Sequence, residues 1–114
     1  MDDCLFCKII AREIPSNKVY EDDMVYAFAD IDPKAPEHIL IIPKKHFDSI
    51  LNVQGEDFAY VDAMMKAAQK ITAERGIAND GFRLVFNTGE NGGQTVKHLH
   101  MHLLGGRSLS WPPG

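Results

Sequence analysis

Three closely spaced histidines are the residues of this sequence best suited to chemistry. Three of the five histidines in the chain stand at His98, His100 and His102. A spacing of two is the side-chain period of a β-strand, so on a strand these imidazoles share one face. On a helix they would diverge, because successive residues are rotated by about 100°. We therefore predict a strand whose other face enters the core through the intervening residues: Leu99, Met101 and Leu103.

The histidine stretch suits attack on phosphorus or an acyl carbon. A neutral imidazole is a nucleophile, and its usual pKa of about 6.5 keeps that form available near pH 7. The glycine-rich loop just before it, residues 89–95, offers backbone N–H groups that could stabilise charge on phosphate oxygens, although by itself such a loop is more typical of a simple hairpin turn. One metal ion held by all three histidines would be strained, since the Cα atoms of His98 and His102 lie about 13 Å apart on a strand. We expect different roles for the three, rather than a solvated face of surface histidines.

Two further groups of polar residues are candidates. Asp30 precedes a proline-stiffened loop, where a carboxylate either accepts hydrogen bonds from a ribose or caps the turn. Cys4 and Cys7 lie one helical turn apart. A redox role would need a βαβ pattern, which does not follow them, and a zinc site would need two more ligands. His46 and His98 are the available ones, and the alternative is a pair of buried thiols.

The surrounding pattern predicts one α+β domain over residues 1–114. Strands are expected over residues 18–21, 24–30, 38–42 and 81–88, followed by the histidine strand. A short helix is expected over residues 4–12 and a long helix over residues 57–75, with a buried stripe of Phe58, Val61, Met65, Ala68 and Ile71. Because most connections between strands are short, the five-stranded sheet should be antiparallel.

Composition narrows the class of protein. The chain has 114 residues, of which 45% are hydrophobic, and a net charge of −4 without a basic stripe. These values favour a domain with a full core and disfavour a binder of nucleic acid polymers. No run approaches the roughly 20 apolar residues of a membrane span, and the acidic start lacks a signal-peptide pattern. We expect a cytoplasmic protein that acts away from membranes, with its cysteines reduced unless they bind metal.

The segment His98–Leu104 resembles the His-φ-His-φ-His-φ-φ signature of the histidine triad family, in which φ is hydrophobic. The similarity is strongest to the Hint branch, the purine nucleoside phosphoramidases, and extends over nearly the whole chain. Flanking matches include residues 30–33, 42–46 and 92–94, then Gly105-Gly106-Arg107 and Trp111-Pro112-Pro113-Gly114. Thr95 departs from the branch, which often has serine there.

The resemblance implies a mechanism. His100 would attack the α-phosphorus of a nucleoside 5′-phosphoramidate, and water would then hydrolyse the nucleotidyl-histidine. His102 and His38 would contact the phosphate and the leaving group, while the main chain of His98 would orient the His100 ring. No metal is required for this chemistry.

The resemblance also implies the binding residues. Asp30 would hold the ribose hydroxyls. The purine pocket would be walled by Phe6, Ile9, Phe28, Ile31 and Leu40, and the phosphate would be held by Asn87, Gly93, Gln94 and Thr95. A homodimer is implied, in which the tail with Trp111 reaches the partner's site. Some bacterial relatives hold a structural zinc ion at positions corresponding to Cys4, Cys7, His46 and His98.

Two other functions fit the same residues. One is hydrolysis of dinucleoside polyphosphates, which the Gly-Gly-Arg and Trp-Pro-Pro-Gly endings disfavour. The other is a nucleotide-binding protein that regulates a protein partner, for which an intact triad would serve equally well.

Overall fold

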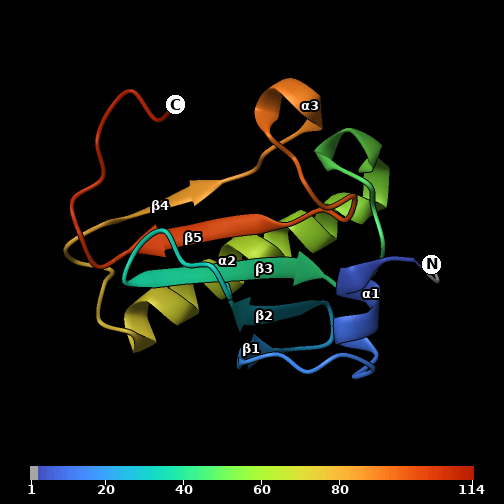
Figure 1. The fold of residues 1–114 in the computed structure, drawn as a ribbon. Helices are drawn as coiled ribbons and strands as arrows, with labels where there is room; N and C mark the ends of the chain where they lie inside the picture. The colour runs from blue at the N-terminus through green and yellow to red at the C-terminus, as the bar shows by residue number, and fades with distance from the viewer. Residues whose placement is uncertain (1–2) are drawn as a thin grey trace.

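A five-stranded antiparallel sheet forms the centre of the molecule. The computed structural model describes residues 3–114 (Figure 1). The strands are β1 (Lys18–Glu21), β2 (Val25–Ala29), β3 (Glu37–Pro43), β4 (Phe82–Val85) and β5 (Met101–Gly105), and they lie in the order β1-β2-β3-β5-β4. The predicted α+β class and antiparallel sheet are confirmed.

Helices pack against the sheet, and shorter helical segments lie in the loops between strands. The long helix α2 (Phe58–Glu74) runs behind the sheet, and the short helix α1 (Leu5–Ile10) lies against one end of β2 and β3 (Figure 1). A four-residue helix, α3 (Gly89–Gly92), occupies the stretch predicted to be loop, and two 3-10 turns, η1 (Ile50–Asn52) and η2 (Gly55–Asp57), precede α2. Within residues 3–114, none of the helices is long and apolar enough to cross a membrane.

The core has two layers, one on each face of the sheet. Strand β3 serves both, because Ile39 and Ile41 pack toward α2 whereas Leu40 and Ile42 pack toward α1. The continuous apolar run predicted this two-sided burial. On the α1 side, Phe6 and Ile9 complete the smaller layer. The short helix α1 is therefore held in place by its buried side chains, since full burial of an apolar side chain stabilises the fold by roughly 1.5–3 kcal/mol.

The buried face of α2 is rotated from its predicted position. The buried residues are Met64, Ala67, Ala68, Ile71 and Thr72, which follow an i, i+3, i+4, i+7, i+8 pattern. The predicted members Phe58 and Met65 are 52% and 44% exposed. A search for apolar residues missed Thr72 because its hydroxyl is polar. That hydroxyl donates to the carbonyl of Ala68 at 2.8 Å, which permits burial.

The histidine stretch is only partly a strand. Hydrogen-bonded pairing with β3 begins at Met101, so His102 lies on β5 while His98 and His100 precede it. The backbone of this leading segment is anchored elsewhere, by the N–H of Leu99 donating to the carbonyl of Phe47 at 2.7 Å. The predicted alternation holds, since Leu99, Met101 and Leu103 all enter the core on the α2 side. The three imidazoles nevertheless do not form one continuous row, because the chain joins the sheet only at Met101, after His98 and His100.

Candidate functional site

A main-chain carbonyl fixes the orientation of the His100 ring. Its Nδ1 donates to the main-chain carbonyl of His98 at 2.7 Å. In the neutral ring this bond leaves Nε2 without a proton and free to attack. The ring is buried against the edge of Phe6, with centroids 5.2 Å apart. Burial lowers the pKa of His100, which favours the neutral, nucleophilic form at neutral pH.

His102 and His38 lie on neighbouring strands beside His100. In the register of β3 and β5, His102 is opposite Leu40 and His38 is opposite Leu104. This diagonal places His38 Nε2 2.9 Å from His102 Nδ1 and 3.4 Å from Asp30 Oδ2. Burial is the main cause that lowers the pKa of His38 and brings the pKa of His102 to about 4. Both rings are therefore neutral near pH 7.

An apolar cavity of about 300 Å³ opens next to these histidines. His100, His102 and Asp30 lie at its edge. The residues predicted to enclose a purine all line it: Phe6, Ile9, Phe28, Ile31 and Leu40. Ile31 forms the rim and is 97% exposed, so a ligand would cover it. A cavity of this size, walled mostly by apolar side chains with a few polar groups, suits a small and largely apolar group of a ligand.

A second, more polar cavity of about 770 Å³ adjoins the first. It is lined by Asn87 and Gly93 from the predicted phosphate site and by Arg83, which the sequence did not single out. Three residues line both cavities: Asp30, Thr95 and His102. A ligand that spans the two cavities would therefore place its central atoms beside His102 and Thr95.

Two predicted binding residues lie outside both cavities. The side chain of Gln94 bridges its own loop, donating to the carbonyls of Asp48 at 2.6 Å and Val96 at 3.0 Å and accepting from the N–H of Gly89 at 3.1 Å. Its backbone N–H also donates to the carbonyl of Gly89. Trp111 is 81% exposed in the single chain. The predicted roles of Gln94 at the phosphate and of Trp111 at a partner's site stay predictions.

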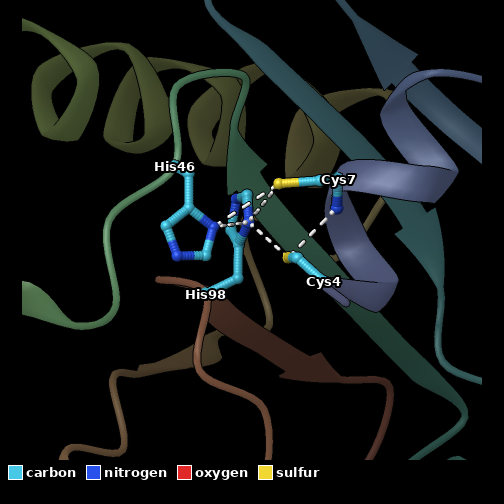
Figure 2. A group of neighbouring side chains, drawn as sticks. All are labelled: Cys4, Cys7, His46 and His98. Carbon is cyan, nitrogen blue, oxygen red and sulfur yellow. Dashed lines mark hydrogen bonds between the residues drawn. The ribbon is translucent and has the colours of Figure 1, made fainter. Parts of the chain in front are cut away.

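Four side chains, one of them two residues before His100, form a compact group whose atoms are typical metal ligands. They are Cys4, Cys7, His46 and His98, and their ligand atoms all lie within 4.8 Å of one another (Figure 2). Nδ1 of His98 is 3.2 Å from Cys4 Sγ and 3.1 Å from His46 Nδ1, and Cys7 Sγ is 3.4 Å from His46 Nδ1. In tetrahedral zinc sites, bonds of about 2.0–2.3 Å place ligand atoms about 3.3–3.8 Å apart. We call this group the Cys₂His₂ cluster.

The surroundings of the Cys₂His₂ cluster leave both Nδ1 atoms free to be ligands. His98 Nε2 donates to the carbonyl of Pro43 at 3.0 Å, and His46 Nε2 donates to Asp48 Oδ1 at 2.8 Å. In the neutral form of each ring, such a bond leaves Nδ1 unprotonated, as metal-bound histidine requires. Burial is the main cause that lowers the pKa of His98 to about 4 and that raises the pKa of the Cys7 thiol to about 11. A bound cation would reverse the shift at Cys7 by stabilising the thiolate. The residues thus fit a zinc ion.

Several groups that complete the site escaped the reasoning from sequence. Asp48 and the Pro43 carbonyl orient the two histidines of the Cys₂His₂ cluster. The backbone N–H of Lys34 donates to His38 Nδ1 at 3.0 Å. Asp48 follows His46 by two residues, which is a usable local signal, whereas main-chain partners of this kind leave no mark in the residue types.

Comparison with known proteins places this arrangement in a family. A family model described as "HIT domain" matches residues 11–109. The chain belongs to the HIT domain family. The match confirms the resemblance drawn from the histidine signature. It begins after Cys7 and ends before Trp111, so the two cysteines and the tail lie outside the part that defines the family.

Individual HIT relatives extend over almost the whole chain. The chain is 52% identical over 108 residues to a purine nucleoside phosphoramidase of Escherichia coli K12, and the aligned part covers 95% of this chain and 91% of that protein. It is 51% identical to an uncharacterised HIT-like protein of Synechococcus elongatus, across 99% of this chain and 98% of the relative. A crystal structure of a HIT family hydrolase from Legionella pneumophila superposes with a TM-score of 0.96 at 49% identity, covering 98% of this chain and all of the other.

Proposed function

We propose that this HIT protein hydrolyses purine nucleoside 5′-phosphoramidates. The observation that carries the proposal is His100, whose Nδ1 is tied to a main-chain carbonyl while its ring borders an apolar cavity that leads into a polar one. A nucleoside suits the apolar cavity, and its 5′-phosphorus would then lie near the shared residues His102 and Thr95. The 52% identity to a protein named purine nucleoside phosphoramidase supports this substrate class and a hydrolase activity.

The proposed reaction has two displacements at phosphorus. His100 Nε2 forms a bond to the α-phosphorus as the P–N bond breaks, and the amine departs with that electron pair and a proton from solvent. Water then attacks the phosphorus and loses a proton to solvent, the bond to His100 Nε2 breaks with its electron pair returning to the ring, and the nucleoside monophosphate is released with a free imidazole. Asp30 would accept hydrogen bonds from the ribose hydroxyls, and Asn87 and Thr95 would contact the phosphate. No step in this scheme requires a metal ion.

A trapping experiment tests the mechanism. The protein is mixed with adenosine 5′-phosphoramidates of simple amines, quenched rapidly at alkaline pH, and digested for mass spectrometry. We expect a nucleotidyl adduct on the peptide that contains His100, and free nucleoside monophosphate at longer times. Diadenosine polyphosphates serve as comparison substrates. Faster turnover of these compounds, or tight nucleotide binding with no turnover of any phosphoramidate, would favour one of the two alternative functions.

We further propose a structural zinc ion on the Cys₂His₂ cluster. Its ligands come from α1 and its N-cap (Cys7, Cys4), from the connector after β3 (His46) and from the segment before β5 (His98). When bound, zinc would link these three parts of the chain and hold the His98 backbone that orients His100. Metal analysis of protein purified without chelators should give close to one equivalent of zinc. A content below a few tenths of an equivalent would contradict the site.

We also propose that the protein forms a homodimer. Strand β4 lies at an edge of the sheet, and Phe82 on it is 37% exposed. The tail beyond β5 carries the exposed Trp111. An open edge strand and an uncovered aromatic side chain are features that a second copy would bury. Light scattering coupled to gel filtration should give twice the chain mass, and a mass of one chain at micromolar concentration would contradict the dimer.

A further inference from the structure

The tautomer of His38 is fixed by the backbone. In the turn between β2 and β3, the N–H of Lys34 donates to His38 Nδ1 at 3.0 Å. A ring nitrogen that accepts a hydrogen bond carries no proton, so the neutral His38 ring must carry its proton on Nε2. His38 is buried, and burial lowers its pKa, so the neutral form prevails.

This proton in turn fixes the tautomer of His102. His38 Nε2 lies 2.9 Å from His102 Nδ1, with Asp30 Oδ2 at 3.4 Å as a weaker second acceptor. Two N–H groups cannot face each other at 2.9 Å, so His102 Nδ1 must be the acceptor. The neutral His102 ring therefore carries its proton on Nε2. The chain of bonds runs from the Lys34 backbone through His38 to His102.

The neighbouring nucleophile has the opposite tautomer. His100 donates from Nδ1 to the carbonyl of His98, which leaves its Nε2 bare. The two rings lie together, with centroids 5.0 Å apart, and both border the same apolar cavity. One ring thus presents a lone pair and the other an N–H. A phosphoryl group needs both, because its phosphorus accepts a lone pair while its anionic oxygens accept hydrogen bonds and repel lone pairs.

We infer that His38 is a positioning residue that keeps His102 in the Nε2–H tautomer, so that His102 donates a hydrogen bond to a phosphoryl oxygen while His100 attacks. The inference rests on the proposed function for its ligand, a nucleoside 5′-phosphoryl compound, but the tautomer itself is a property of the free protein. In this role His38 acts through His102 and need not touch the substrate.

Matched substitutions at His38 test the relay. In His38→Gln the side-chain amide still offers an N–H₂ group near the position of the imidazole Nε2, so it can donate to His102 Nδ1. In His38→Met a side chain of similar size and shape has no donor. The tautomer of His102 is read from its two ring nitrogens by ¹⁵N NMR of histidine-labelled protein above pH 7.5, without any substrate. Affinity for AMP and turnover of a phosphoramidate are measured on the same three proteins.

The wild-type protein and His38→Gln should show His102 protonated on Nε2 and unprotonated on Nδ1. His38→Met should show a mixture of tautomers and a loss of about tenfold or more in AMP affinity, as expected when a hydrogen bond to a charged group is weakened. Wild-type His102 protonated on Nδ1 would overturn the inference, and that measurement needs no variant to fold. So would His38→Met with an unchanged tautomer and unchanged affinity. Failure of the proposed function would appear differently, as a wild-type protein with the expected tautomer and no turnover.

Discussion

The two histidine groups of this protein use the same side chain for opposite purposes. In the Cys₂His₂ cluster, His46 and His98 both have Nε2 bonded to an oxygen, and both aim a bare Nδ1 at the sulfurs of Cys4 and Cys7. In the group that borders the cavity, His100 instead has Nδ1 bonded to an oxygen and Nε2 bare. The hydrogen bond made by the other ring nitrogen therefore decides what each histidine can do. Residue type and spacing alone would not have separated them.

The two groups are joined at one residue. The side chain of His98 belongs to the Cys₂His₂ cluster, while its carbonyl accepts the bond that orients His100. We therefore expect substitutions in the two groups to differ in their effects. Substitutions at the cavity should leave the Cys₂His₂ cluster intact, whereas substitutions in the Cys₂His₂ cluster should also disturb the orientation of His100, the proposed nucleophile.

The largest effect is expected from His100→Ala. Removal of the proposed nucleophile should lower phosphoramidate turnover by about 10³-fold or more, because the proposed covalent intermediate forms on the Nε2 atom of this ring. Zinc content should stay near the wild-type value, since the His100 side chain is not a ligand, whereas thermal stability should fall because a buried, hydrogen-bonded ring is removed. Turnover within tenfold of wild type would show that His100 is not the nucleophile.

The next largest effect is expected from Cys7→Ser, a nearly isosteric change. Loss of one thiolate should remove most of the bound zinc, measured by metal analysis after dialysis, and should cost about 2 kcal/mol or more in the free energy of unfolding. Phosphoramidate turnover should fall as well, because the His98 backbone loses a tether. Ser49→Ala, a change at a buried serine outside both groups, serves as the control for general loss of stability. Full zinc content in Cys7→Ser would contradict the proposed ligand set.

A smaller effect is expected from Asp48→Asn. The carboxylate accepts the Nε2–H of His46 at 2.8 Å, and loss of such a partner typically weakens metal affinity by about 10–100-fold. Competition with a zinc-binding dye measures the affinity. At saturating zinc, turnover should match wild type within about threefold. A large loss of turnover under those conditions would mean that Asp48 serves the reaction directly.

The smallest effect is expected from Thr95→Ser. Thr95 lines both cavities, and serine keeps the hydroxyl while removing a methyl group. The KM for phosphoramidates should change by less than about threefold. Thr95→Val, which keeps the shape but removes the hydroxyl, should raise KM by about tenfold if the hydroxyl bonds the phosphate. Equal KM values for the serine and valine variants would remove Thr95 from the phosphate site.

Much of this arrangement follows from residue patterns. The continuous apolar run in β3 predicted its burial on both faces, and the alternation of Leu99, Met101 and Leu103 predicted which side of that segment enters the core. The family signature and its flanking motifs were enough to group Asp30 and His38 with the triad. These features are readable because they depend on side-chain chemistry at fixed periods.

The features that sequence reasoning missed depend on main-chain groups and on neighbours far along the chain. The strand was expected to include His98 and His100, but the bond from Leu99 to Phe47 holds that segment away from the ladder. The tautomer of His38 is set by the backbone N–H of Lys34, which every residue type except proline could supply. The tautomer of His98 is set by the carbonyl of Pro43, which any residue type could supply. The face of α2 was misplaced because apolar residues such as Phe58 and Met65 also lie on its exposed side, and because the buried Thr72 does not register as apolar.

The contact between Cys4 and His98 has a consequence for how the protein is made. The two residues are separated by 94 positions in the sequence, so two parts of the chain that are made far apart in time must meet. A nascent chain that has emerged through α2 already contains β1, β2 and β3, but it has neither His100 nor the His98 carbonyl that orients its ring. The Cys₂His₂ cluster and the orientation of the His100 ring are thus completed only after residue 100 has been made, and the first turn of α1 must stay accessible until then.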